Sequence, residues 1–179
     1  EFCDRLGAAR RLWRGRVRRR PLPWYAAEKA SHGAYAAFLG LSLNDRTGGW
    51  RALAVGDCNL FQLRGLGPGL RLTQAFPLER SCDFGTSPFL LGSMARPGDD
   101  PAPHLRQASG VLPGDGMLLL ASDALSAWLL SRAEGASPAW EAVSRAADAI
   151  RQGKTLAEVF AAYLRDVPDE PMEIWRIKD

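Results

Sequence analysis

The chain has 179 residues, of which 46% are apolar and 24% are charged, proportions typical of a globular protein with a sizeable core. No apolar run is long enough to span a bilayer, so we expect no membrane partner. The three cysteines, Cys3, Cys58 and Cys82, show no CxxC spacing. This pattern argues against a disulfide framework and a zinc site, and it favours a reducing, cytoplasmic setting.

The net charge of +3 hides a strongly basic N-terminus. Residues 1–20 contain eight arginines against Glu1 and Asp4, a charge of +6, so the remaining residues carry −3. Apolar residues recur there at helical spacings and predict an amphipathic helix; they are Phe2, Leu6, Ala9, Trp13 and Val17. The basic run suggests a nucleic-acid patch, but no aromatic residues are interleaved with it as stacking platforms. We therefore prefer a solvated helix face followed by a basic turn, and we expect no nucleic-acid partner.

Glycine-rich turns predict a series of antiparallel strands in the next third of the chain. A short helix is expected over 24–30. Turn chemistry at 44–49 and 65–69 separates apolar runs, which favours consecutive antiparallel pairs; the expected strands are 34–43, 50–56, 59–64 and 70–76. Strands do not alternate with helices here, which argues against a parallel sheet.

The rest of the chain is expected to be irregular at first and then mainly helical. Residues 77–113 are rich in proline and glycine and predict loops. A buried strand follows at Met117–Ala121. Three helices are then expected on one side of the structure, over 124–133, 138–152 and 155–165. Ser137 is the expected N-cap of the second, with Pro138 at its first position, and Thr155 and Glu158 match a capping box that opens the third. A last strand is expected over 172–177.

Two aspartates stand at the ends of buried strands. Asp57 follows the strand at 50–56, and Asp123 follows Met117–Ala121. Carboxylates at the rim of a sheet can converge on one cation, although Asp57 also fits a turn residue and Asp123 an N-cap. Cys58 invites a nucleophile interpretation, but neither histidine can be placed beside it, so we interpret it as a small buried side chain. Both histidines, His32 and His104, are expected at the surface, and the six tryptophans in the core.

The order of the motifs adds a resemblance to a known family. The chain resembles the bacterial branch of the metal-dependent type 2C (PPM) Ser/Thr protein phosphatases over about residues 21–179. The motifs that carry it are Pro21-Leu-Pro-Trp-Tyr25 with Glu28-Lys29, Gly33-Ala-Tyr-Ala-Ala-Phe-Leu39, Ala54-Val-Gly-Asp-Cys-Asn-Leu-Phe61, Phe84-Gly-Thr-Ser-Pro88, and Gly114-Asp115 with Leu118-Leu-Leu-Ala-Ser-Asp-Ala-Leu125. The resemblance implies an α+β fold, a four-layer αββα sandwich. It implies one phosphatase-like domain over residues 1–179, with the family's N-terminal strands expected to lie before Glu1.

The resemblance also implies metal ligands. Asp123 matches the aspartate that ligates one of two core Mn²⁺ or Mg²⁺ ions, although Ala124 replaces the usual glycine. Asp57 matches a ligand of a third metal, with Cys58 in place of serine. Asp169 is the best match to the last metal aspartate, although the usual hydroxyl residue after its acidic pair is missing. Hard divalent ions prefer such carboxylate oxygens, and the nucleophile is then a metal-activated water rather than a side chain.

The implied activity is hydrolysis of phosphoserine or phosphothreonine in a protein substrate, in bacterial cytoplasmic signalling with a cognate Ser/Thr kinase. The family's Asp-Gly-x-Gly element is not found in the chain, so we expect the chain alone to be inactive. We also expect it to be poorly stable, because missing strands leave sheet edges open. The alternative is a catalytically inactive, phosphatase-like binding module.

Overall fold

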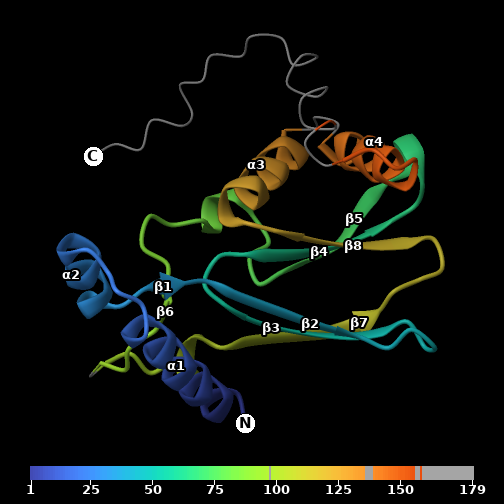
Figure 1. Ribbon diagram of the computed structural model, residues 1–179. Coiled ribbons are helices and arrows are strands. Elements are labelled where there is room, and N and C mark those ends of the chain that lie inside the picture. The colour runs from blue at the N-terminus through green and yellow to red at the C-terminus, as the bar shows by residue number, and fades with distance from the viewer. Residues whose placement is uncertain (97, 136–138, 156–157, 159–179) are drawn as a thin grey trace.

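Figure 1 shows the computed structural model, which describes residues 1–96, 98–135, 139–155 and 158. The helices are α1 (Phe2–Arg18), α2 (Trp24–His32), α3 (Asp123–Glu134) and α4 (Ala139–Arg151). The strands are β1 (Tyr35–Ala36), β2 (Phe38–Leu43), β3 (Gly49–Val55), β4 (Asn59–Arg64), β5 (Arg71–Phe76), β6 (Leu91–Gly92), β7 (Arg106–Val111) and β8 (Gly116–Ala121). Short 3₁₀ turns, η1 (Gly67–Gly69), η2 (Ser81–Asp83) and η3 (Ala102–His104), lie between strands.

The strands form three antiparallel sheets, which confirms the expected mixed α+β class. Two sheets have three strands each, in the orders β2-β3-β7 and β5-β4-β8, and β1 pairs with β6. The two larger sheets lie face to face, and α3 and α4 cover the outer face of β5-β4-β8 (Figure 1). On the other side, α1 lies next to β2-β3-β7.

Two apolar layers hold these elements together. Between the sheets, Trp50 of β3 and Leu60 of β4 are almost inaccessible, and the Trp50 indole donates a 2.6 Å hydrogen bond to Gln62 across the sheets. Between β5-β4-β8 and the helices, Phe61 packs with Leu129. Burial of such large side chains is the main force that stabilises both interfaces.

The expected series of consecutive antiparallel pairs is wrong at one step. β2 pairs with β3, and β4 pairs with β5, but β3 and β4 belong to different sheets. The chain crosses between the sheets at residues 56–58. Stacking buries Ala52 and Ala54 of β3 against Leu60 of β4, which side-by-side pairing in one sheet would not achieve. The expected single strand over 34–43 is also divided into β1 and β2.

A second correction concerns residues 77–113, which are not irregular throughout. β7 lies there and pairs with β3, with Gly110 opposite Trp50. Its sequence, Arg-Gln-Ala-Ser-Gly-Val, has few apolar residues because its outer face is largely exposed. The strand is therefore specified by its partner rather than by a local pattern.

The C-terminal helices agree with the predictions as far as the structure describes them. α3 and α4 lie on one side of the molecule (Figure 1). The capping box is confirmed, because the Thr155 N–H donates to Glu158 at 2.7 Å and the Glu158 N–H donates to the Thr155 hydroxyl at 3.3 Å. Ser137, Pro138, the remainder of the expected helix over 155–165 and the expected strand over 172–177 lie outside the described residues. Not every tryptophan is in the core, since Trp24 is 80% exposed.

The close approach of β7 to Trp50 can be tested with a pair of glycine substitutions. A Cβ at Gly110 would lie 2.8 Å from the Trp50 ring, and this ring is 2% exposed, so it has little room to move away. We expect Gly110→Ala to lower the free energy of unfolding by about 1–3 kcal/mol, the usual cost of overpacking. Urea unfolding midpoints measure this difference.

Gly114→Ala is the matched control. Among the residues that the structure describes, no atom other than those of Gly114 and its two chain neighbours lies within 4 Å of the position that its Cβ would occupy. Its unfolding midpoint is therefore expected to stay close to that of the unsubstituted chain. Equal midpoints for the two variants would contradict the described packing of Trp50 against Gly110.

Candidate functional site

The pairing of β4 with β8 brings Asp57 and Asp123 to the same end of one sheet. Asn59 of β4 stands opposite Ala121 of β8. The two antiparallel strands run in opposite directions, so the residues just before Asn59 lie beside the residues just after Ala121. Asp57 is thereby placed beside the first turn of α3, where Asp123 is located. The predicted convergence of these two aspartates is thus supported by strand register.

Asp57 is positioned by an obligatory glycine turn. Gly56 has a φ of +99°, and a Cβ there would lie 2.8 Å from the Cβ of Ala37; only glycine satisfies both conditions. The turn leaves Asp57 half-buried. Burial raises the pKa of the Asp57 carboxyl, and the negative charge of Asp123 also raises it. A hydrogen bond with the backbone of Asp57 itself lowers this pKa, but the net shift is upward.

Asp123 is the first residue of α3 rather than its N-cap. Ser122 occupies the N-cap position, and its side chain makes no capping hydrogen bond. The carboxylate of Asp123 is exposed and stands in the first helical turn, where the helix dipole favours negative charge. The interpretation of Asp123 as an N-cap is therefore wrong, and its side chain remains available at the rim.

Cys58 follows Asp57 in the chain and interacts with both aspartates. Burial raises the pKa of the Cys58 thiol, the charges of Asp57 and Asp123 raise it further, and a hydrogen bond involving the backbone of Asp123 opposes these effects. Because a thiol with a raised pKa stays protonated, this environment disfavours a nucleophilic role for Cys58. Its contact with the backbone of Asp123 instead joins the β3–β4 connection to the first turn of α3.

Two buried polar residues that the sequence patterns did not single out hold this end of the sheet. Asn59 is completely inaccessible; its side-chain amide donates to the Leu78 carbonyl at 2.6 Å and accepts from the Leu78 N–H at 3.2 Å. Ser126, also inaccessible, donates to the Ala121 carbonyl at 3.4 Å. An asparagine directly before the apolar pair Leu60-Phe61 was the available signal, because a buried polar group needs partners.

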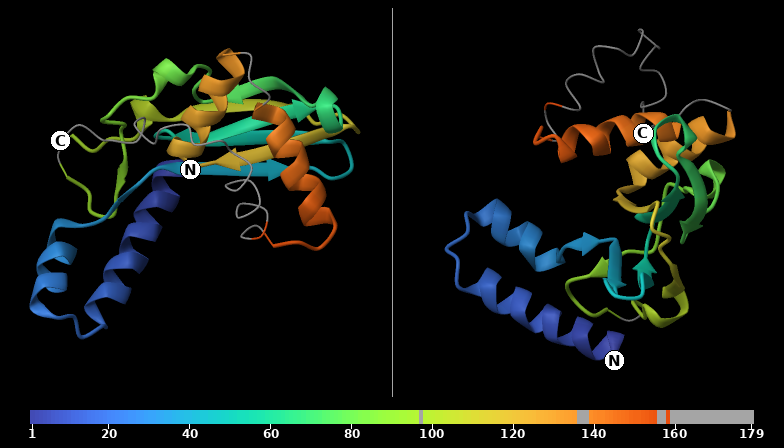
Figure 2. Two further views of the ribbon diagram at one scale, coloured as in Figure 1. Left: turned by 90° about the horizontal axis from the view of Figure 1, so that it is seen from above. Right: turned by 90° about the vertical axis from the view of Figure 1, so that its right-hand side faces the viewer.

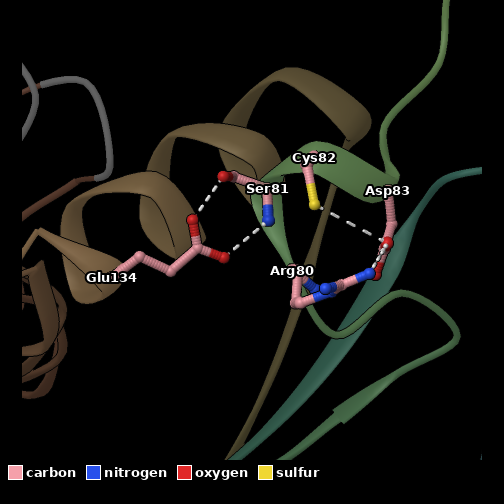
Figure 3. Close-up of polar contacts among 5 residues, drawn as sticks. All are labelled: Arg80, Ser81, Cys82, Asp83 and Glu134. Atoms are coloured by element: carbon pink, nitrogen blue, oxygen red, sulfur yellow. Dashed lines mark hydrogen bonds and ion pairs between the residues drawn. The ribbon is translucent and has the colours of Figure 1, made fainter.

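The opposite end of α3 is anchored to the η2 turn (Figure 3). The backbone N–H of Ser81 donates to Glu134 at 2.8 Å, and the Ser81 hydroxyl donates to the same carboxylate. These two hydrogen bonds are the main reason that the pKa of Glu134 is lowered. Nearby, Arg80 forms an exposed ion pair with Asp83 at 3.3 Å. α3 is thus tied at both ends to neighbouring connections, which restricts the position of Asp123.

The donor set is suited to a hard divalent cation but is small. Asp57 and Asp123 supply carboxylate oxygens, the donors that Mg²⁺ and Mn²⁺ prefer, and a cation would relieve their mutual repulsion. Asp169, the third predicted ligand, lies outside the described residues. Within residues 1–96, 98–135, 139–155 and 158, no cluster of three or more His, Cys, Asp or Glu side chains is arranged to hold a metal. The two carboxylates therefore fit part of a metal site.

A separate groove, with a cavity volume of about 1160 Å³, lies between α1 and the outer face of β2-β3-β7. Phe2 and Leu6 line it on the helix side, and Leu53 and Gln107 line it on the sheet side. Neither Asp57 nor Asp123 lines this groove, so its volume has no direct bearing on the carboxylate pair.

Comparison of the chain with models of protein families, with curated proteins and with solved structures found no match. Among the residues that the structure describes, no helix combines the length and apolar character needed to cross a membrane.

The raised pKa of Asp57 predicts that its charge destabilises the folded chain. A carboxyl whose pKa is raised by folding contributes stability below its unfolded pKa of about 4, and this contribution is lost as pH rises through the raised value. At pH 7 the ionised Asp57 is therefore unfavourable, and we expect Asp57→Asn to raise the melting temperature. The gain should shrink as pH falls through the raised pKa toward about 4, and little of it should remain below about 4, where Asp57 is protonated in both states. Thermal unfolding of both proteins, monitored by circular dichroism from pH 7 down to below about pH 4, measures this difference in melting temperature.

Asp45→Asn serves as the control, because Asp45 lies exposed in the turn at the opposite end of β3. It should leave the melting temperature nearly unchanged across the same range. A lower melting temperature for Asp57→Asn at pH 7, with Asp45→Asn unchanged, would contradict the described burial and charge environment of Asp57.

Proposed function

We propose that this chain belongs to a metal-dependent Ser/Thr protein phosphatase of the type 2C (PPM) kind and forms part of its four-layer αββα sandwich. The observation that carries the proposal is the meeting of Asp57 and Asp123 at one sheet edge, which agrees with the ligand roles that the motif resemblance implies for them. Each aspartate follows a buried strand, and the two are electrostatically coupled, since the charge of Asp123 acts on Asp57.

The arrangement of layers also supports the proposal. Two antiparallel sheets stack face to face, two helices cover one outer face, and a third helix lies beside the other (Figure 1). An αββα sandwich has this order of layers. The chain's exposed sheet edges, such as β8 with Leu120 47% exposed, are compatible with further strands that complete each sheet.

In this proposal Asp123, Asp57 and Asp169 hold Mn²⁺ or Mg²⁺ ions. When bound, such ions supply an activated water and neutralise charge on a phosphoryl group. The chain's own residues act as oxygen ligands or orient those ligands. Cys58 contacts the backbone of Asp123, and Asn59 and Ser126 hold the adjoining ends of β4 and β8 through hydrogen bonds to the backbone of Leu78 and Ala121.

The proposed substrate is a phosphoserine or phosphothreonine side chain on a bacterial cytoplasmic signalling protein, which requires a cognate Ser/Thr kinase to phosphorylate it. A second candidate is a phosphatase-like binding module without turnover. The small number of carboxylates gathered in the described part of the chain favours this second candidate, and the experiment below separates the two.

The test measures the activity of the 179-residue chain and of the full gene product that contains it. We expect the full gene product to hydrolyse p-nitrophenyl phosphate and a phosphothreonine peptide with Mn²⁺. The 179-residue chain should show little activity, because an ion of this type needs about six oxygen ligands. Asp123→Ala in the full gene product should lower kcat/KM by more than about 100-fold, the upper figure for residues that merely orient a metal ligand.

Asp45→Ala removes an exposed carboxylate from the turn before β3, at the end of that strand opposite Asp57, and should leave kcat/KM nearly unchanged. Equal losses in the two variants would remove the case for Asp123 as a ligand. A full gene product that is inert with Mn²⁺ but binds a phosphorylated protein would support the binding module instead.

A further inference from the structure

Helices α1 and α2 form an arm that projects from the body of the molecule. In both views of Figure 2 the two helices lie side by side, and the link between them is at the end farthest from the sheets. We call this end the arm tip and define it as residues 18–25. All eight of its residues are exposed.

The arm carries a high density of positive charge. Between Asp4 and Glu28 the chain has eight arginines and no acidic residue. Three of the arginines, Arg18, Arg19 and Arg20, are consecutive at the tip. In the described part of the chain, none of these three forms an ion pair with a carboxylate. Their charge is therefore directed to solvent or to a partner.

Large apolar side chains are exposed beside these arginines. Leu22 is 37% exposed, Trp24 80% and Tyr25 55%, and Leu12 on the adjoining helix is 66% exposed. Pro21 and Pro23 flank Leu22 and restrict the backbone of the link. Isolated exposed apolar residues are common on protein surfaces, but several together beside a basic cluster indicate an interaction site.

Within the described part of the chain, the contacts that hold the arm to the body lie away from its tip. Phe2 packs against Phe38 of β2, with ring centroids 5.4 Å apart. Arg10 donates to the Gly92 carbonyl at 2.9 Å, and Arg96 donates to the His32 carbonyl at 2.6 Å. These contacts attach the base of the arm to the body of the molecule, and the tip takes part in none of them.

We propose that the arm tip docks on an anionic lipid bilayer. Tryptophan and tyrosine favour the membrane interface, leucine favours hydrocarbon, and each arginine near an anionic leaflet adds attraction to its headgroups. Such contact needs no membrane-spanning segment. The expectation of a merely solvated helix face followed from the helix pattern alone, which did not place Leu22, Trp24 and Tyr25 beside the arginines in space.

A nucleic acid is the less suitable occupant of the tip. Bases stack on the flat faces of aromatic side chains that follow one another along a strand. The rings of Trp24 and Tyr25 instead meet edge to face, at an interplanar angle of 87°, and do not form a pair of parallel platforms. Exposed leucines likewise add nothing to phosphate or base recognition, whereas they add affinity for a bilayer.

The test is sedimentation of the 179-residue chain with vesicles of phosphatidylcholine alone or mixed with phosphatidylserine. We expect binding to the mixed vesicles, little binding to phosphatidylcholine, and weaker binding as salt is raised. The triple substitution Arg18→Gln, Arg19→Gln and Arg20→Gln should weaken binding by roughly 100-fold, since each arginine near the surface contributes about a factor of five. Trp24 fluorescence should be quenched by brominated lipid, and Trp24→Phe should remove most of that quenching.

The matched control removes the same charge elsewhere, with Arg46→Gln in the turn between β2 and β3, Arg71→Gln on β5 and Arg106→Gln on β7, where all three side chains are exposed. It should bind mixed vesicles within about twofold of the unsubstituted chain, because charges beyond a Debye length of roughly 10 Å are largely screened. Equal weakening in both triple variants, or no binding to mixed vesicles, would overturn the proposal. Binding to a single-stranded oligonucleotide but not to the vesicles would also overturn it, in favour of nucleic acid. None of these outcomes depends on phosphatase activity.

Discussion

The burial of β4 on both faces is the constraint on which the rest of the structure depends. Asn59, Leu60, Phe61 and Leu63 are each at most 1% exposed. A strand with apolar side chains on both faces is stable only between two covering layers. Leu60 is covered by the sheet of β3, and Phe61 and Leu63 are covered by the helices. The stacking of the sheets and the position of α3 and α4 therefore follow from one strand.

The same constraint explains where the carboxylates lie. β3 and β4 must stack rather than pair, so the chain leaves one sheet and enters the other within residues 56–58. Gly56 permits this crossing, and the residue that follows, Asp57, is left half-buried. Because β8 pairs with β4, the start of α3 is brought to the same place. The unfavourable desolvation of Asp57 is thus a consequence of the crossover, and pKa shifts produced in this way are frequent at functional sites.

Local patterns in the sequence predicted single elements well and their partners less well. The apolar runs predicted β3, β4 and β8, and helix periodicity predicted α3 and α4. These patterns report which residues are buried, not which strand lies alongside, so the division of β3 and β4 between sheets was missed. β7 was missed because Ser109 and Gly110 carry little strand signal without Trp50 beside them. The convergence of Asp57 and Asp123 was predicted from their positions after buried strands, while Asp169 lies outside the described residues.

The physical character of α1 accounts for the way it joins the body. A segment with so many arginines cannot be buried, because desolvating unpaired charges is very costly. α1 accordingly has no buried residue, and a groove of about 1160 Å³ remains between it and the sheet. The attachment of α1 depends on Phe2 and Arg10. Core packing does not require the exposed apolar residues of the arm tip. Residues that do nothing for the fold, yet combine charge with exposed rings, are better explained by contact with another surface than by stability.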